Sequence, residues 1–154
     1  MKIKDKDLPY FYEIADLIIN HPIFLKSKKY PHHSNYSCYD HSVNVAKRCY
    51  AFVKKWHIPC NLEALIRSAL FHDFYLYDWH DKNKGFRFHG FVHPTKAILN
   101  SKLICELTNK EKRAIRSHMW PLTLFHIPTS IEGWVLTYND KIQAIKEAFT
   151  KKKA

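Results

Sequence analysis

Apolar residues recur at intervals of three and four along most of the chain, which is the spacing of amphipathic helices. From this pattern we predict six helices, at residues 6–20, 39–56, 61–75, 93–107, 110–119 and 130–149. The third predicted helix shows one core-facing stripe, formed by Leu62, Leu65, Ile66, Ala69, Leu70 and Asp73. Because the strand signal is negligible, the sequence predicts an all-α fold, a compact bundle of about six helices.

Capping signals and prolines predict where several of these helices begin. Asn61 is suited to cap the third helix. The fifth and sixth helices are preceded by Thr108-x-x-Glu111 and Thr129-x-x-Glu132, which have the spacing of capping boxes. Pro94 suits the first turn of the fourth helix. Residues 21–37 and 76–92 carry no helical pattern and are predicted to be irregular.

Length and composition favour a single globular domain over residues 1–154, with an N-terminal helix at 6–20 and a basic tail at 150–154. The chain is 46% hydrophobic, which excludes general disorder. It contains no apolar run near the roughly 18 residues of a membrane span, and residues 1–7 do not form a signal peptide. None of the four cysteines forms a C-x-x-C pair, so we expect reduced thiols in a cytoplasmic protein.

The net charge of +11 favours an anionic partner. Nucleic acid, a small phosphorylated molecule and a membrane surface all satisfy that condition. The sequence contains no common nucleic-acid motif, and its basic residues do not gather on one predicted helix. The charge does not choose among these partners, and a solvated surface also accounts for it. Nucleic acid is possible but not favoured, and no membrane partner is expected.

Histidine and aspartate recur at positions where a bundle should be apolar. Asp73 lies within the apolar run 69–74, and an unpaired carboxylate is costly to bury, so it needs a cation or strong donors. Five predicted helices contribute one or both residue types, at His41, His72 with Asp73, His93, His118 and Asp140. Facing helices can direct such side chains at one centre. Imidazole and carboxylate ligands suit iron, manganese, zinc or cobalt, and six of them suit two metal ions bridged by a carboxylate.

The order of these residues resembles the HD-domain superfamily of metal-dependent phosphohydrolases. The resemblance covers about residues 38–147, which would form the HD core. It is carried by the segments Asp40-His41-Ser42-x-x-Val45-Ala46, Ala69-Leu70-Phe71-His72-Asp73, His93-Pro94-x-x-Ala97, Ile115-x-x-His118 and Asn139-Asp140-Lys141-Ile142. The chain departs from several signalling members of the superfamily in having Leu76 where they have lysine. It also lacks the Gly-Tyr-Pro signature of cyclic-dinucleotide phosphodiesterases.

The resemblance implies a centre of two divalent transition-metal ions, iron or manganese first, with zinc, cobalt or nickel as alternatives. His41, His72 and Asp140 would hold one ion, His93 and His118 the other, and Asp73 would bridge them. The implied reaction is hydrolysis of a phosphate ester or phosphoanhydride, of a nucleotide or another small phosphorylated metabolite, by a metal-bound hydroxide. A mixed-valent diiron oxygenase and a non-catalytic nucleotide- or nucleic-acid-binding module remain alternatives.

Residues around these motifs are candidates for contacts with substrate. Asp73 and His89 are predicted to be catalytic, His89 as a proton donor to the leaving group. The predicted substrate-binding residues share a positive charge that suits phosphate, and they are Arg87, Lys96, Lys141 and Arg116. Each prediction has a structural alternative, such as a solvated surface cation or a satisfied core histidine. The remaining histidines, which include His32, lie in predicted loops and show no significant pairing with a carboxylate.

Overall fold

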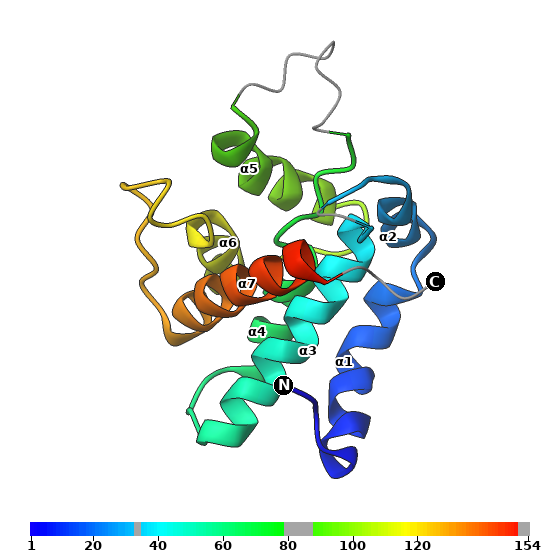
Figure 1. Cartoon of the computed structure of the whole chain (residues 1–154), viewed down its shortest axis with the longest axis vertical. Helices are drawn as coiled ribbons and strands as arrows, with labels where there is room; N and C mark the ends of the chain where they lie inside the picture. Colours follow the sequence, from blue (N-terminus) through cyan, green and yellow to red (C-terminus); the bar gives the residue numbers. More distant parts are fainter. Residues whose placement is uncertain (33–34, 79–87, 151–154) are drawn as a thin grey trace.

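Helix α3 (Cys38–Trp56) runs through the middle of the molecule and packs mainly against α4 (Leu62–Phe71) and α7 (Ile131–Phe149) (Figure 1). The structure is a computed structural model that describes residues 1–32, 35–78 and 88–150. Within those ranges the chain forms helices and no strand beyond an isolated β-bridge between Pro31 and Ser37. The predicted all-α bundle is confirmed.

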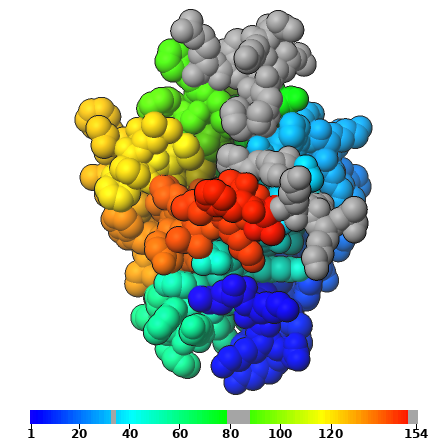
Figure 2. All heavy atoms as spheres, in the orientation of Figure 1, coloured from blue at the N-terminus to red at the C-terminus, as the bar shows by residue number. Residues whose placement is uncertain are grey.

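The remaining helices surround this central group. Helix α1 (Leu8–Ile19) packs on α4, and α6 (Asn109–Ser117) contacts α4, α5 (His89–Ser101) and α7. Three short elements complete the described chain: η1 (Asp5–Asp7), α2 (Pro22–Leu25) and η2 (Lys26–Lys29). Figure 2 shows α7 crossing one face of the molecule, with the N-terminal residues covering the surface below it. Among the described residues, no helix has the length and apolar character needed to cross a bilayer.

Helix α4 is the most enclosed element, since seven of its ten residues are buried. Leu65, Ile66, Ala69 and Leu70 have no exposed surface, because α1, α3, α6 and α7 all contact this helix. The helix ends at Phe71, with His72 as its C-cap, rather than at residue 75 as predicted. The His-Asp pair therefore lies just beyond the end of a helix that delivers it into the interior.

Of the three predicted capping residues, two are confirmed and one is wrong. The side chain of Asn61 accepts a hydrogen bond from the Ala64 amide (2.9 Å), and Thr108 forms a capping box with Glu111. Helix α7, however, is capped by Ser130, which accepts from the Gly133 amide (3.1 Å), rather than by Thr129. The carboxylate of Glu132 is not available for a box, because it accepts from the Asn61 amide (2.8 Å) and from Lys110 (3.2 Å).

Helix α5 also departs from the prediction, since it spans His89–Ser101 instead of residues 93–107. Pro94 thus lies inside the helix, where its missing N–H removes only one backbone bond, the one to the first-turn carbonyl of Gly90. Beyond Ser101 the chain tightens into short turns, in which the Ile104 and Cys105 amides both bond to the Ser101 carbonyl. Residues 21–37, predicted to be irregular, contain the short helices α2 and η2.

Candidate metal centre

All six predicted metal ligands lie together in the interior. They come from five helices or helix ends, and none exposes more than 9% of its surface: His41 (α3), His72 and Asp73 (after α4), His93 (α5), His118 (after α6) and Asp140 (α7). Three overlapping groups have ligand atoms within 4.8 Å of one another, and these are His32–His41–Asp73, His41–His72–Asp140 and His72–Asp73–His118. The helical bundle therefore brings together the six residues that were predicted to be metal ligands.

Helix geometry sets which ring nitrogen of each histidine faces inward. His72 and His118 are the C-caps of α4 and α6, where the last carbonyls of a helix lack backbone partners. Nδ1 of His72 donates to the Ala69 carbonyl (2.8 Å), and Nδ1 of His118 donates to the Ile115 carbonyl (2.6 Å). Nδ1 of His93 donates in the same way to the His89 carbonyl (3.0 Å). These partners assign the proton to Nδ1 and leave Nε2 for the centre.

His41 is oriented by a carboxylate instead. Its Nδ1 donates to Glu147, 2.7 Å away, and the same buried carboxylate accepts hydrogen bonds from Asn44 (3.0 Å) and Gln143 (2.8 Å). Glu147 was not among the predicted site residues. A signal existed, because Asp140, Gln143 and Glu147 follow the i, i+3, i+7 spacing of one helix face and are all buried on α7.

Asp73 lies between two sets of histidines. Its Oδ1 atom is 3.1 Å from Nε2 of His93 and 3.6 Å from Nε2 of His118. Its Oδ2 atom is 3.7 Å from Nε2 of His41 and 3.5 Å from Nε2 of His72. Asp140 completes the second of these sets, since its Oδ1 atom is 2.9 Å from His41 and 3.4 Å from His72. Each oxygen of Asp73 thus faces a different pair of imidazoles.

The donor atoms of this cluster fit a metal ion better than they fit one another. Nδ1 of both His93 and His118 donates to a backbone carbonyl, so the two Nε2 atoms face each other as acceptors across 3.0 Å. The buried Nε2 atom of His72 has no hydrogen-bond partner among the described residues. Such contacts between acceptors are repulsive unless a cation or a proton lies between them. The buried histidines and aspartates can therefore hold metal.

The pKa values of the cluster are set by burial and by the charged or hydrogen-bonding groups next to each residue. Burial alone raises the pKa of Asp73, but the neighbouring His72 and contacts with three other histidines hold that pKa well below its usual range. Burial lowers the pKa of His41, but hydrogen bonds to Asp140 and Glu147 outweigh it and raise that pKa to about 10. Burial lowers the pKa of His118, which keeps its ring neutral. A bound metal would replace the proton on His41, so binding should release protons.

A fifth histidine, His32, joins the cluster; it lies in a loop as predicted, but the expectation that it pairs with no carboxylate is wrong. His32 is 8% exposed, and its Nε2 atom lies 2.8 Å from Oδ2 of Asp73. Its ring stacks on His41 with centroids 3.8 Å apart. No periodic pattern in the sequence points to His32, because it precedes α3 in an irregular segment.

A cavity of about 480 Å³ opens onto the cluster. It is lined by His32, Asp73, His89, His93, His118, Met119, Pro121, Leu122, Asp140, Lys141 and Ala144. Lys141 donates to the His118 carbonyl (3.0 Å), and burial lowers the pKa of its ammonium group. The ring of His89 stacks on His93 with centroids 4.6 Å apart. One side of the cavity is thus formed by the histidines and carboxylates of the cluster, and the other by apolar side chains that include Met119, Pro121 and Leu122.

The other predicted substrate residues lie in different places. Lys96 lines an adjoining cavity of about 430 Å³ together with Tyr75, Tyr77, Val92 and His89, which borders both cavities. Arg116 is exposed on α6 and is not among the described residues that line either cavity. Arg87 lies outside the described residues.

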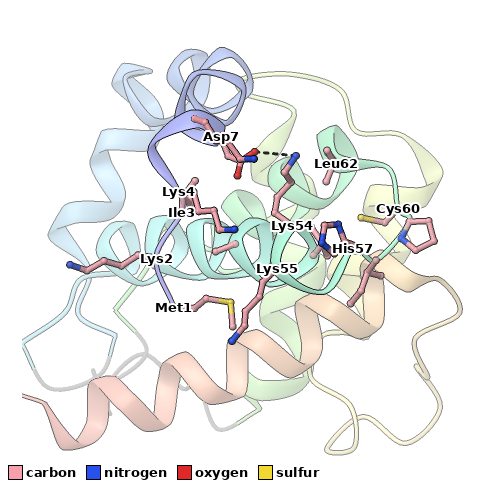
Figure 3. A pocket seen from close by; sticks show the side chains of 15 residues that line it. Met1, Lys2, Ile3, Lys4, Asp7, Lys54, Lys55, His57, Cys60 and Leu62 are labelled. Atoms are coloured by element: carbon pink, nitrogen blue, oxygen red, sulfur yellow. Dashed lines mark ion pairs between the residues drawn. The ribbon is translucent and has the colours of Figure 1, made fainter.

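Five lysines line a separate cavity of about 450 Å³, which shares no lining residue with the metal cluster. Figure 3 shows lysines of the N-terminal segment and of α3 around it, including Lys2, Lys4 and Lys55. Lys54 is paired with Asp7 at 3.1 Å. The net charge of the chain is therefore not concentrated at the candidate centre.

The chain matches no protein-family model, no curated protein and no solved structure.

Proposed function

We propose that the chain is a metal-dependent phosphohydrolase with two divalent transition-metal ions. His41, His72 and Asp140 would hold one ion, His93 and His118 the other, and Asp73 would contribute one oxygen to each. The observation that carries the proposal is the division of Asp73 between two sets of imidazoles, with Oδ2 facing His41 and His72 and Oδ1 facing His93 and His118. The resemblance of the ordered motifs to the HD-domain superfamily supports the same assignment.

The nature of the ligands indicates which metals to expect. Imidazole nitrogen with carboxylate oxygen suits iron and manganese, with zinc, cobalt and nickel as alternatives. Two such ions can lower the pKa of a water molecule and neutralise charge on phosphoryl oxygens. No nucleophilic side chain is then required, and the protein has to bind, orient and protonate the substrate.

Lys141 and the apolar side of the cavity serve the first two tasks in this proposal. The ammonium group of Lys141 is held at the cavity by the His118 carbonyl and adds positive charge beside the phosphate position. Met119, Pro121 and Leu122 form the apolar side of the same cavity. They would exclude water and contact the less polar part of the substrate.

His89 is suited to the third task. Its Nδ1 atom is 2.9 Å from the Tyr77 hydroxyl, and its ring stacks on His93, so the side chain is held at the wall between the two cavities. A leaving group that extends past His89 would reach the aromatic cavity, where Tyr77 can stack on a base and Lys96 can bind a further phosphate. This arrangement favours a nucleotide substrate, with His89 as proton donor.

A non-catalytic binding module is the second candidate. The basic cavity next to Lys55 favours it, because an anionic ligand there would make no use of the metal cluster. Such a module should bind nucleotides or nucleic acid with an affinity that falls with salt and does not depend on Asp73.

A substrate screen tests the proposed activity. We expect the protein loaded with manganese, iron, cobalt or nickel to release phosphate or a nucleotide from at least one member of a panel of nucleotides, dinucleoside polyphosphates and phosphate esters. His89→Ala should lower the rate about 100-fold or more, as expected for loss of a proton donor. Arg113→Ala, which alters an exposed cation of α6, serves as the control.

Two results would contradict the hydrolase assignment. A protein that carries two ions and turns over no member of the panel would not be the proposed enzyme, although the metal centre would stand. Substrate-dependent oxygen uptake would instead assign the centre to oxygenase chemistry.

A further inference from the structure

We propose that His32 is a seventh metal-site residue, which ligates the ion held by His41, His72 and Asp140. The inference rests on the proposed dinuclear function and adds a residue that the motif pattern does not include. It makes the two ions differ in their number of protein ligands. The contacts that support it come from the segment that leads into α3.

The backbone around His32 is fixed next to the start of α3. The amide of His32 donates to the Tyr36 carbonyl (2.9 Å), and the amide of Cys38 donates to the Tyr30 carbonyl (2.9 Å). An isolated antiparallel bridge joins Pro31 to Ser37, the N-cap of α3. These bonds attach His32 to the N-terminal end of α3. His41 lies in the first turn of the same helix, so the two imidazoles approach the cluster together.

The side chain of His32 reaches the donor atoms directly. Its Nε2 atom is 2.8 Å from Oδ2 of Asp73, the oxygen that also faces His41 and His72. The ligand atoms of His32, His41 and Asp73 all lie within 4.8 Å of one another. Two ligands about 2.0–2.2 Å from one ion are separated by at most about 4.4 Å, so only a small adjustment would bring all three atoms to a shared ion.

A ligand at this position makes the two ions unequal. The first ion would have protein ligands from His32, His41, His72, Asp73 and Asp140, whereas the second would have only His93, His118 and Asp73. An ion with more protein ligands is held more firmly and keeps fewer positions for water or substrate. The first ion should therefore be the tighter one. The cavity borders residues of both ions, so the open positions of the second ion, rather than the position of the cavity, should direct substrate to His93 and His118.

The competing explanation is that His32 only donates a hydrogen bond to Asp73. The variants His32→Ala and His32→Gln separate these roles, because glutamine keeps an N–H donor but is a poor ligand for a transition metal. His126→Ala removes an exposed histidine and is the matched control. Each purified protein would be titrated with Co²⁺ or Mn²⁺ by calorimetry, and Co²⁺ absorption spectra would report the coordination. Circular dichroism would show that each variant is folded.

We expect both His32 variants to bind the tighter ion about tenfold or more weakly than wild type, with a Co²⁺ spectrum typical of fewer ligands, while the second ion and His126→Ala are unaffected. Wild-type affinity and spectrum in His32→Gln would overturn the inference and leave His32 as a hydrogen-bond donor. Two unchanged ions in both variants would remove His32 from the site while leaving the dinuclear centre intact. A wild-type protein that binds no ion would instead refute the proposed function itself.

Discussion

Asp73→Asn is expected to abolish metal binding while leaving the helical fold intact. The substitution keeps the size of the side chain but leaves one carbonyl oxygen where two carboxylate oxygens face two sets of histidines. An amide is a weak ligand for a transition metal and brings no charge to neutralise the ions. Since both ions would lose a shared ligand, we expect affinity to fall at least about 100-fold for each.

Thermal unfolding with added metal measures this effect. Wild type at a free metal concentration of 100 times the Kd of each site should gain about 2.7 kcal/mol of stability per bound ion, whereas a 100-fold weaker Asp73→Asn should gain at most about 0.4 kcal/mol per site at the same concentration. Asp16→Asn, which alters an exposed carboxylate on α1, is the control and should behave as wild type. An equal metal-induced shift in Asp73→Asn would show that Asp73 is not a ligand.

Glu147→Gln is expected to weaken one ion selectively. Glu147 is 1% exposed, and its carboxylate accepts the Nδ1 proton of His41 at 2.7 Å. A glutamine amide that donates to Nδ1 would move the ring proton to Nε2, where it would block the metal. Residues that orient a metal-bound histidine typically contribute 10- to 100-fold in affinity, so we expect a loss of about that size for the ion at His41.

Stepwise metal titration separates this loss from a general effect. The ion at His93 and His118 should keep its affinity in Glu147→Gln, because neither ring contacts Glu147 in the described structure. Glu106→Gln alters a glutamate that is exposed on the surface and should leave both ions unchanged. If the two ions weaken equally in Glu147→Gln, the carboxylate acts on the fold rather than on His41.

The sequence could predict the ligands that interrupt an apolar helical pattern. Asp73 stands out because it follows the apolar run of a helix in which seven of ten residues prove to be buried. His41, His118 and Asp140 could be selected because each lies on or beside a helix with a clear apolar face. Whether a side chain on a helix is buried depends on its position in the apolar repeat, and that repeat can be recognised directly in the sequence.

The residues that were missed depend on contacts between distant segments. His32 is brought to Asp73 by the bonds around Pro31 and Ser37, and no periodic pattern marks such a connection. A distant contact also explains the wrong prediction for Glu132, which has the spacing of a capping box but accepts a hydrogen bond from the Asn61 amide instead. Glu147 could have been found, because polar residues on the buried face of α7 recur at helical spacing.

The number of metal ions bound per chain is the most direct test of the proposed dinuclear centre. Untagged wild-type protein, purified without chelator, would be analysed for its elements and quantified in the same sample. The dinuclear centre predicts about two transition-metal ions per chain, removed by chelator and restored by manganese or iron. A chain that binds no transition metal even after this reconstitution would contradict the account, and its buried histidines and aspartates would be structural residues.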